Sequence, residues 1–338
     1  MCCKERLKPI RISSISMEEF ETIFDDTAHR LNWNCLFVLP FWLKNWWQVF
    51  GTGRTRAILA FRSGTSILGV APLMLEGHAA RFLGSESVCD YQDMIFADNC
   101  PDDFFSLLLD YLRTMDVCRI ELGALRPDSR VLSGLSEAAK RSGYHTACAE
   151  AGKSYALELP KTWEGYLDIL DGNQRHEIRR KIRRLNEAGR IDYHVVSNKN
   201  AVADAFDEFL MLFQASRQDK AEFLTDQMKS FFRSMAITMA QRGLLQLGFL
   251  SIDGKTAAST LCFEYANTVF LYNNGYRPEF QELSVGSLGK IFSIKHAIEK
   301  KKACYDFLKG DEAYKERLGG RPLPLYRLTI DLNNKAGF

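Results

Sequence analysis

The chain has 338 residues, of which 46% are hydrophobic and 25% are charged, and its formal net charge is +2. This length predicts two domains, and the composition is that of an ordinary folded protein rather than a disordered one. A charge so close to neutral gives no support for general DNA binding.

Hydrophobic periodicity predicts a regular order of elements in the first half. The predicted elements are a strand at 10–15, a helix from Met17, a helix at 41–50, a hairpin of 56–61 and 66–75, a strand pair around 91–96, a helix at 104–113, a strand at 119–122 and a helix at 132–142. The Ser63-Gly64 turn joins the hairpin, and Gly143 ends the last helix. The polar residues Tyr91, Gln92 and Asp93 either line a cleft or mark a sheet edge.

The second half repeats this order of helix, hairpin, strand, helix and strand. Its predicted elements are a strand at 154–159, helices at 174–190, 206–216 and 225–242, a hairpin of 245–252 and 256–265, a strand at 268–274, a helix at 285–301 and strands at 303–308 and 325–330. The repetition predicts an internal structural duplication. We therefore expect one domain at residues 1–153 and a second at residues 154–338.

The helix at residues 174–190 has a strongly basic outer face. Ile178, Ile182 and Leu185 form one apolar stripe, whereas the arginines of the other face greatly outnumber its two glutamates. Such a face is either a solvated surface or a phosphate-binding one, because arginine forks match phosphate oxygens. On the second interpretation, Arg179 and Arg180 are cofactor-binding candidates.

The stretch Asp306–Lys315 contains the candidate catalytic residues. The predicted strand carrying Asp306 ends at Gly310, and a helix starting at Asp311 returns Tyr314 and Lys315 over the strand end. Titratable groups at the carboxyl end of a strand are typical of active sites in open α/β sheets. Tyr314 could protonate a leaving group, with Asp306 or Lys315 positioning the acceptor. Alternatively, Tyr314 packs and Asp306 pairs with Lys315, while Asp311 caps the helix.

A second candidate region joins the strand ending in Tyr276 to the next helix. That helix opens with Gly286, Ser287 and Leu288. Backbone N–H groups at a helix N-terminus bind anions, and a glycine there allows a pyrophosphate to approach closely. The alternative is an ordinary helix start capped by Ser284.

Several other classes of site find no support. The nine cysteines form no Cys-x-x-Cys pair and the six histidines no paired spacing, which argues against a metal site and suits a reducing compartment. The sequence contains no Gly-x-Ser-x-Gly elbow and no P-loop. The longest apolar run, residues 36–43, is too short to span a bilayer. We expect a cytoplasmic protein.

The sequence resembles the GNAT-fold acyltransferases of the CelD-like group associated with cellulose biosynthesis, which are relatives of the FemAB aminoacyltransferases. The resembling segments are residues 163–185, Arg217, residues 248–263, 272–276, 286–288 and 306–315, together with the aromatic helix at 41–50 and its following hairpin. The resemblance implies an α/β fold of two tandem GNAT-like domains. Each would be a mixed, largely antiparallel sheet flanked by helices.

This resemblance also implies an activity. We expect N- or O-acyl transfer from an acyl-CoA, in particular acetyl-CoA, without a metal. The expected acceptor is a sugar or amino-sugar precursor of a surface polysaccharide, and the protein could associate with the polysaccharide biosynthesis machinery. Two alternatives remain open: aminoacyl transfer from a charged tRNA, which the basic helix supports, and a non-catalytic scaffold, because the usual glycine-rich pyrophosphate loop is not intact.

Overall fold

A computed structural model describes residues 9–335, and its internal contacts divide the chain into two compact units. Unit 1 comprises the residues up to Gly152 and those from Pro324 onward, and unit 2 comprises Lys153–Leu323. The chain passes between them within two long strands, β8 (Tyr144–Glu158) and β14 (Arg321–Lys335). The last strand was expected in the second domain. It belongs to unit 1 instead, because it pairs with strand β7.

Unit 1 is a mixed sheet with the strand order β1-β3-β4-β5-β7-β14-β8. The strands not yet bounded are β1 (Ile10–Ser14), β3 (Thr55–Ser63), β4 (Ser66–Glu76), β5 (Ala79–Phe82) and β7 (Arg119–Leu125), with the short strands β2 (Leu31–Asn32) and β6 (Ile95–Ala97) paired off this path. Neighbours from β1 to β5 are antiparallel, and β5 and β7 are parallel.

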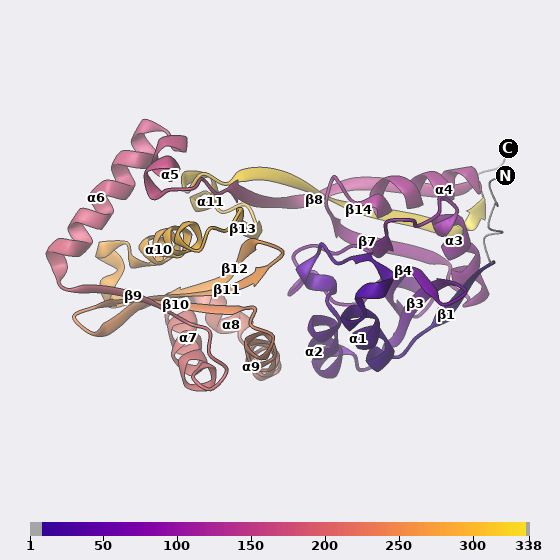
Figure 1. Cartoon of the computed structure of the whole chain (residues 1–338), viewed down its shortest axis with the longest axis horizontal. Coiled ribbons are helices and arrows are strands. Elements are labelled where there is room, and N and C mark those ends of the chain that lie inside the picture. The colour runs from indigo at the N-terminus through magenta and orange to yellow at the C-terminus, as the bar shows by residue number, and fades with distance from the viewer. Residues whose placement is uncertain (1–8, 336–338) are drawn as a thin grey trace. The chain divides into compact units, whose positions relative to one another are not determined.

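Helices flank this sheet, as Figure 1 shows. They are α1 (Met17–Asp25), α2 (Pro40–Phe50), α3 (Phe104–Thr114) and α4 (Ser136–Arg141), with short helical turns at Thr27–His29, Leu36–Val38 and Val131–Leu135. The core between the sheet and α3 and α4 is formed by apolar side chains such as Phe61, Phe104 and Leu108. Burial of this apolar surface is the main force that holds the layers together.

Unit 2 has the strand order β8-β13-β12-β11-β10-β9. Its own strands are β9 (Ile191–Val196), β10 (Leu245–Ile252), β11 (Lys255–Tyr265), β12 (Thr268–Tyr276) and β13 (Cys304–Lys309), and its helices are α5 (Trp163–Ile169), α6 (Gly172–Ala188), α7 (Val202–Ser216), α8 (Gln218–Phe223), α9 (Asp226–Gln241), α10 (Val285–Glu299) and α11 (Tyr314–Arg317), with a 3-10 turn, η4, at Pro278–Leu283. Figure 1 shows α10 on one face of the sheet and α7, α8 and α9 on the other.

The two units share one pattern of strand pairing. In unit 2 the strands from β9 to β12 are antiparallel in succession, β12 and β13 are parallel, and β13 is antiparallel to β8. In unit 1 the strands β1, β3, β4, β5, β7 and β14 follow the same sequence of pairings. The predicted fold class is therefore confirmed: each unit is a mixed, largely antiparallel α/β sheet flanked by helices.

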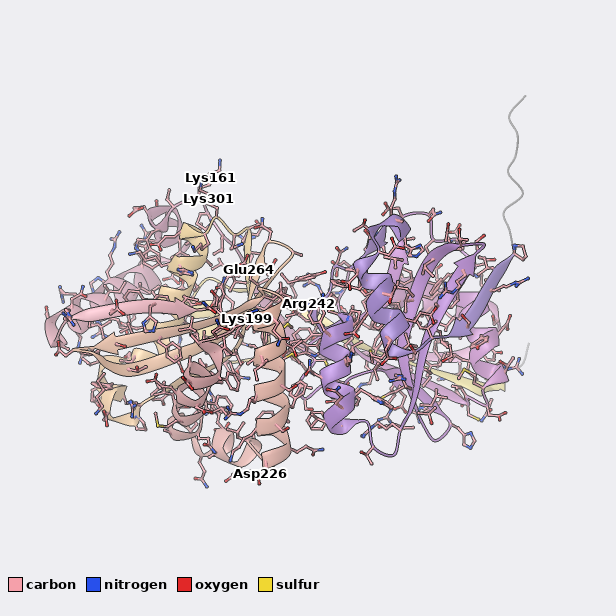
Figure 2. All side chains as sticks on the ribbon, turned by 60° about the horizontal axis from the view of Figure 1, so that its bottom comes forward. Lys161, Lys199, Asp226, Arg242, Glu264 and Lys301 are labelled. Carbon is pink, nitrogen blue, oxygen red and sulfur yellow. The ribbon has the colours of Figure 1, made fainter. Side chains whose placement is uncertain are left out.

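Two local features concern the helices of unit 2. A Cβ added at Gly275 in β12 would lie 2.4 Å from the backbone nitrogen of Phe213, so only glycine allows α7 to approach so closely. Figure 2 shows Asp226 and Arg242 at opposite ends of α9, where their charges complement the helix dipole.

The structure corrects several predicted elements. The expected strand pair around residues 91–96 is only the short strand β6, because Tyr91, Gln92 and Asp93 lie in a loop. The predicted helix at 132–142 is a π-helical turn followed by the short helix α4. Four further elements, β5, β9, α5 and α8, were not predicted, and each is seven residues or shorter.

Candidate active site

The parallel strands β12 and β13 separate partway along their length. Their pairing ends where Phe270 faces Asp306. Beyond this point β12 continues along β11, and β13 continues along β8. We call the diverging parts, residues 271–276 and 307–309, the strand split of unit 2. Open α/β sheets bind ligands at the carboxyl ends of parallel strands, so the split is the expected place for chemistry.

Backbone irregularities mark both sides of the split. In β12 the register against β11 shifts between Leu271 and Asn273, so Tyr272 is the extra residue of a β-bulge. In β13, Leu308 adopts a left-handed conformation with φ 63°. Its backbone N–H donates to Asp306 Oδ1 at 2.8 Å, which stabilises the bend. Bulges and strained residues of this kind re-aim side chains and cluster at functional sites.

Two lysines bind carbonyl oxygens at the ends of the split strands. Lys315 Nζ donates to three carbonyl oxygens, those of Leu308, Lys309 and Gly310, at 3.0, 2.7 and 3.2 Å. Lys315 is 1% exposed, and Glu312 Oε2 lies 3.0 Å from its amine. On the β12 side, Lys220 of α8 donates to the carbonyl oxygen of Asn274. Buried carbonyl groups need a partner, and the lysines supply one where strand pairing has ended.

A third lysine, Lys290 of α10, lies close by. It is 6% exposed; its Nζ donates to the Gly286 carbonyl oxygen at 2.9 Å and lies 4.4 Å from the ring centroid of Tyr314. Within residues 9–335, no carboxylate forms an ion pair with it. Burial, together with the charge of Lys220, lowers the pKa of Lys290 to about 7, and burial with the charge of Arg217 lowers the pKa of Lys220 to about 8. A nearby anion would favour the charged form of both amines.

The three predicted catalytic residues lie on β13 and at the start of α11. Asp306 is 2% exposed within the strand, and Tyr314 is half-buried at the first position of α11. The Tyr314 ring meets Phe307 edge to face, with centroids 6.4 Å apart. Lys315 holds the strand-end carbonyl groups described above. The catalytic roles of Asp306, Tyr314 and Lys315 stay predictions.

The start of α11 differs from the prediction. Ala313, rather than Asp311, is the N-cap residue. Asp311 instead accepts a hydrogen bond from the Tyr155 hydroxyl at 2.6 Å, and this bond raises the pKa of Tyr155. Asp311 therefore links the loop to β8 rather than capping the helix.

The predicted anion-binding region is a close contact between β12 and α10. A Cβ added at Gly286 would lie 2.9 Å from the Tyr276 ring, so the glycine lets the helix start pack against the strand end. The backbone N–H groups of Ser287 and Leu288 donate to the Ser284 carbonyl oxygen. Ser284 occupies the N-cap position with φ 58°, and its side chain makes no capping hydrogen bond. Binding of a donor here stays a prediction.

Helix α6 places its two predicted phosphate ligands differently from each other. Arg180 forms a bidentate pair with Glu177, at 2.8 Å for both bonds, which lowers the pKa of Glu177 to about 2. Arg179 lines an open groove with Trp163 and Ile182. Lys181, which the sequence analysis did not select, is the α6 residue whose charge acts on Lys290.

Comparison with known proteins identifies this unit. Residues 172–316 match the family Acetyltransf_6, described as an acetyltransferase (GNAT) domain. Unit 2 contains a GNAT acetyltransferase domain. The predicted enzyme class, a GNAT-superfamily acyltransferase, is thereby confirmed. No curated protein matches the chain.

Solved structures share the fold over nearly the whole chain at low sequence identity. The crystal structure of FemX has a TM-score of 0.62 and 12% identity and covers 94% of this chain and 96% of its own. The C-terminal domain of a putative lysylphosphatidylglycerol synthetase from Agrobacterium fabrum has a TM-score of 0.59 and 12% identity and covers 93% and 92%. A Bacteroides thetaiotaomicron protein of unknown function has a TM-score of 0.59 and 13% identity and covers 96% and 100%. These likenesses show the fold alone.

The GNAT domain contains two residues of interest that the sequence analysis missed. Lys220 and Lys290 lie on helices far apart in sequence, and neither belongs to a motif. A signal was present for Lys290: it follows Gly286 by one helical turn, which places both on one face of α10.

Among the helices of residues 9–335, none combines the length and apolar character needed to cross a bilayer.

Proposed function

We propose that the GNAT domain of unit 2 transfers an acyl group from an acyl-CoA, in particular acetyl-CoA, to an amino or hydroxyl group. The observation that carries this proposal is the strand split, where bent strand ends, buried lysines and the Gly286 helix start converge. A phosphate-bearing donor suits a region where Lys290 is buried and Lys220 half-buried, and where neither pairs with a carboxylate of residues 9–335.

The proposed reaction is a direct transfer. The acceptor nitrogen or oxygen attacks the thioester carbonyl carbon, the new bond to carbon forms, and the bond to sulfur breaks. Backbone N–H groups in the split polarise the carbonyl. Tyr314 donates a proton to the leaving thiolate, and a carboxylate or a water chain takes the proton from the attacking amine or hydroxyl group. Asp306 or Lys315 positions the acceptor. Tyr276, Gly286, Ser287 and Leu288 would contact the donor, and the basic face of α6 with Arg179 would hold phosphates.

The acceptor we propose is a sugar or amino-sugar precursor of a surface polysaccharide, modified in the cytoplasm. The resemblance of segments 272–276 and 306–315 to CelD-like acyltransferases supports this choice. A glycan acceptor would also be consistent with an association with polysaccharide biosynthesis proteins.

A charged tRNA is the second candidate donor. The likeness of fold to FemX and to the lysylphosphatidylglycerol synthetase domain supports it, together with the arginine-rich outer face of α6. Because such binding would depend on phosphate contacts, it would weaken strongly with increasing salt.

Thermal unfolding with added donors tests the proposal. Acetyl-CoA should raise the melting temperature of the wild type by mass action, since it binds only the folded state. Ser287→Glu, which places a negative charge at the start of α10, should abolish the shift. Gln241→Glu on the opposite face of the sheet is the matched control and should keep it. A shift with aminoacyl-tRNA but with no CoA thioester would overturn the acyl-CoA proposal in favour of the second donor.

A further inference from the structure

Unit 1 contains a cavity of about 300 Å3 near the carboxyl end of its parallel strands. Three connections line it. The first, between α1 and α2, contributes Asn32 and Asn34; the second, between β5 and α3, contributes Tyr91 and Asp93. The third is the loop after β7, residues 126–130. A volume of this size is at the lower end of small-molecule sites.

The same three connections surround the candidate site of unit 2. There, the connection between the first helices carries Lys220, the connection after β12 leads to Lys290, and the loop after β13 leads to Tyr314. The shared strand order therefore places the cavity of unit 1 where the other copy of the fold has its predicted chemistry. Because the two units have the same strand order, the backbone is arranged in the same way at both positions, and each can hold a ligand.

Two guanidinium groups at the cavity wall lie over aromatic rings. The guanidinium carbon of Arg126 lies 5.3 Å from the ring centroid of Tyr91, and that of Arg130 lies 4.6 Å from the ring centroid of Phe96. Contact with an aromatic ring restricts the orientation of a guanidinium fork. Arg126 Nε also donates to Asp128 Oδ1 at 3.3 Å, so Arg130 is the candidate to bind a ligand. Within the described residues, Arg130 forms no ion pair with a carboxylate.

The Asp93 carboxyl is equally fixed. Its Oδ1 accepts hydrogen bonds from the Met94 backbone N–H at 2.8 Å and from the Ser129 hydroxyl at 3.0 Å. Burial raises the pKa of Asp93 to about 6, so the group is mostly ionised at neutral pH. Two carboxylates, Asp93 and Asp128, thus balance the two guanidinium groups of the lining. A site for a strongly anionic ligand would instead carry excess positive charge.

We propose that this cavity is a binding site for a neutral sugar. Vicinal hydroxyl groups both donate and accept hydrogen bonds, and the rigid, paired polar atoms of guanidinium, carboxylate and amide groups match them. Asn32 and Asn34 supply the amides, Arg130 and Asp93 the charged partners, and apolar atoms of Val38 and other neighbours complete the wall. The proposal does not depend on which donor the GNAT domain of unit 2 uses.

Saturation-transfer difference NMR on the full chain tests this site, with N-acetylglucosamine and glucose as the probes. We expect saturable binding that weakens by about tenfold in Asp93→Asn and in Arg130→Met, since each variant removes a charge-assisted hydrogen bond. Asn keeps the oxygen that accepts from Met94 and Ser129, so Asp93→Asn should still fold. Asp110→Asn on α3 and Arg141→Met on α4 are matched controls with exposed side chains, and they should bind as the wild type does.

Three outcomes would overturn the proposal. The first is no sugar binding by the folded wild type, and the second is equal binding by all four variants. The third is binding of inorganic phosphate alone, lost in Arg130→Met, which would make the cavity an anion site. None of these outcomes affects the melting-temperature shift expected from acetyl-CoA, so failure of this site and failure of the donor site are separately visible.

Discussion

The two units have the same strand order but differ in the side chains that bind the carbonyl groups at the ends of their parallel strands. In unit 1, Gln92 ties the strands together: its backbone N–H donates to the Ala124 carbonyl oxygen at 3.3 Å and its Nε2 to the Leu83 carbonyl oxygen at 2.6 Å. In unit 2, the corresponding carbonyl groups are bound by Lys220 and Lys315. The carbonyl groups at the strand ends are therefore bound by a neutral amide in unit 1 and by lysine side chains in unit 2.

The charged groups differ in the same way. In unit 1, Arg81 lies 2.6 Å from Glu121 and 3.0 Å from Glu76, so the charges beside the strands neutralise one another. In unit 2, Lys220 and Lys290 have depressed pKa values and no carboxylate partner within the described residues. A fold can thus be duplicated while only one copy keeps lysines whose charge an anionic group of a ligand could stabilise. This contrast is why we assign the acyl donor to unit 2.

The largest expected effect concerns the acyl transfer itself. If the strand split of unit 2 is the catalytic one, Tyr314→Phe should lower the turnover number about 10²- to 10⁴-fold, because it removes the general acid. Steady-state release of CoA measures this, and thermal unfolding should show little change. Tyr111→Phe on α3 of unit 1 is the control. A large loss of stability without a specific loss of turnover would show that Tyr314 acts by packing.

Much of the fold could be predicted from sequence because its signals are local. The Asp253-Gly254 turn between two apolar runs predicts the hairpin of β10 and β11, and apolar residues spaced three or four apart predict α10. The short strand β5 and the short helix α8 carry too few residues for a periodic signal. The last strand has a clear pattern, but nothing local reveals that it pairs with β7 of unit 1 rather than with a strand of unit 2.

The candidate site was predictable only where its residues are contiguous. Asp306, Tyr314 and Lys315 lie in one segment, so a strand followed by a helix start suffices to place them together. Lys220 and Lys290 come from separate helices, and their depressed pKa values arise from burial that only the assembled sheet produces. Charged residues are normally expected at the protein surface, so a buried lysine such as Lys290 is not predicted from the sequence.

The next effect concerns the stability of unit 2 and its dependence on pH. The folded-state pKa of Lys290 is about 7, whereas that of an exposed lysine is 10.5, so the unfolded state binds more protons between these values and stability rises with pH there. Below pH 7 the folded protein carries the full cost of charging a buried amine. Lys290→Met should remove that cost, on the order of a few kcal/mol, and raise the melting temperature.

Melting curves across the pH range test this expectation for Lys290→Met. The gain should be largest below pH 7 and disappear as the pH approaches 10.5, because the wild-type lysine is then neutral in both states. Half-exposed Lys229→Met on α9 is the control and should show no such trend. A variant less stable than the wild type below pH 7 would mean that the ammonium group is stabilised in the folded state, which would remove the contrast with unit 1.

A smaller effect is expected at the closed end of unit 1. Gln92→Met keeps the side-chain size but leaves the buried Leu83 carbonyl oxygen without its donor, which should cost about 1–3 kcal/mol. Urea denaturation measures the loss, with the exposed Gln48→Met of α2 as the control. Acyl transfer should be unchanged, since the glutamine lies outside the GNAT domain. A loss of turnover at unchanged stability would show that unit 1 takes part in the chemistry.

The smallest effect should come from the ion pairs of unit 1. Glu121→Gln removes the pairing with Arg81 and Arg119, whose side chains are 43% and 58% exposed, so water already screens most of the attraction. We expect a loss of less than about 1 kcal/mol that shrinks further in high salt. Urea denaturation at low and high salt measures it. A salt-independent loss of several kcal/mol would mean that these ion pairs stabilise the strands of unit 1 as strongly as the lysines stabilise the strand ends of unit 2. The two units would then differ in the charge of these groups but not in how strongly the groups hold the strands.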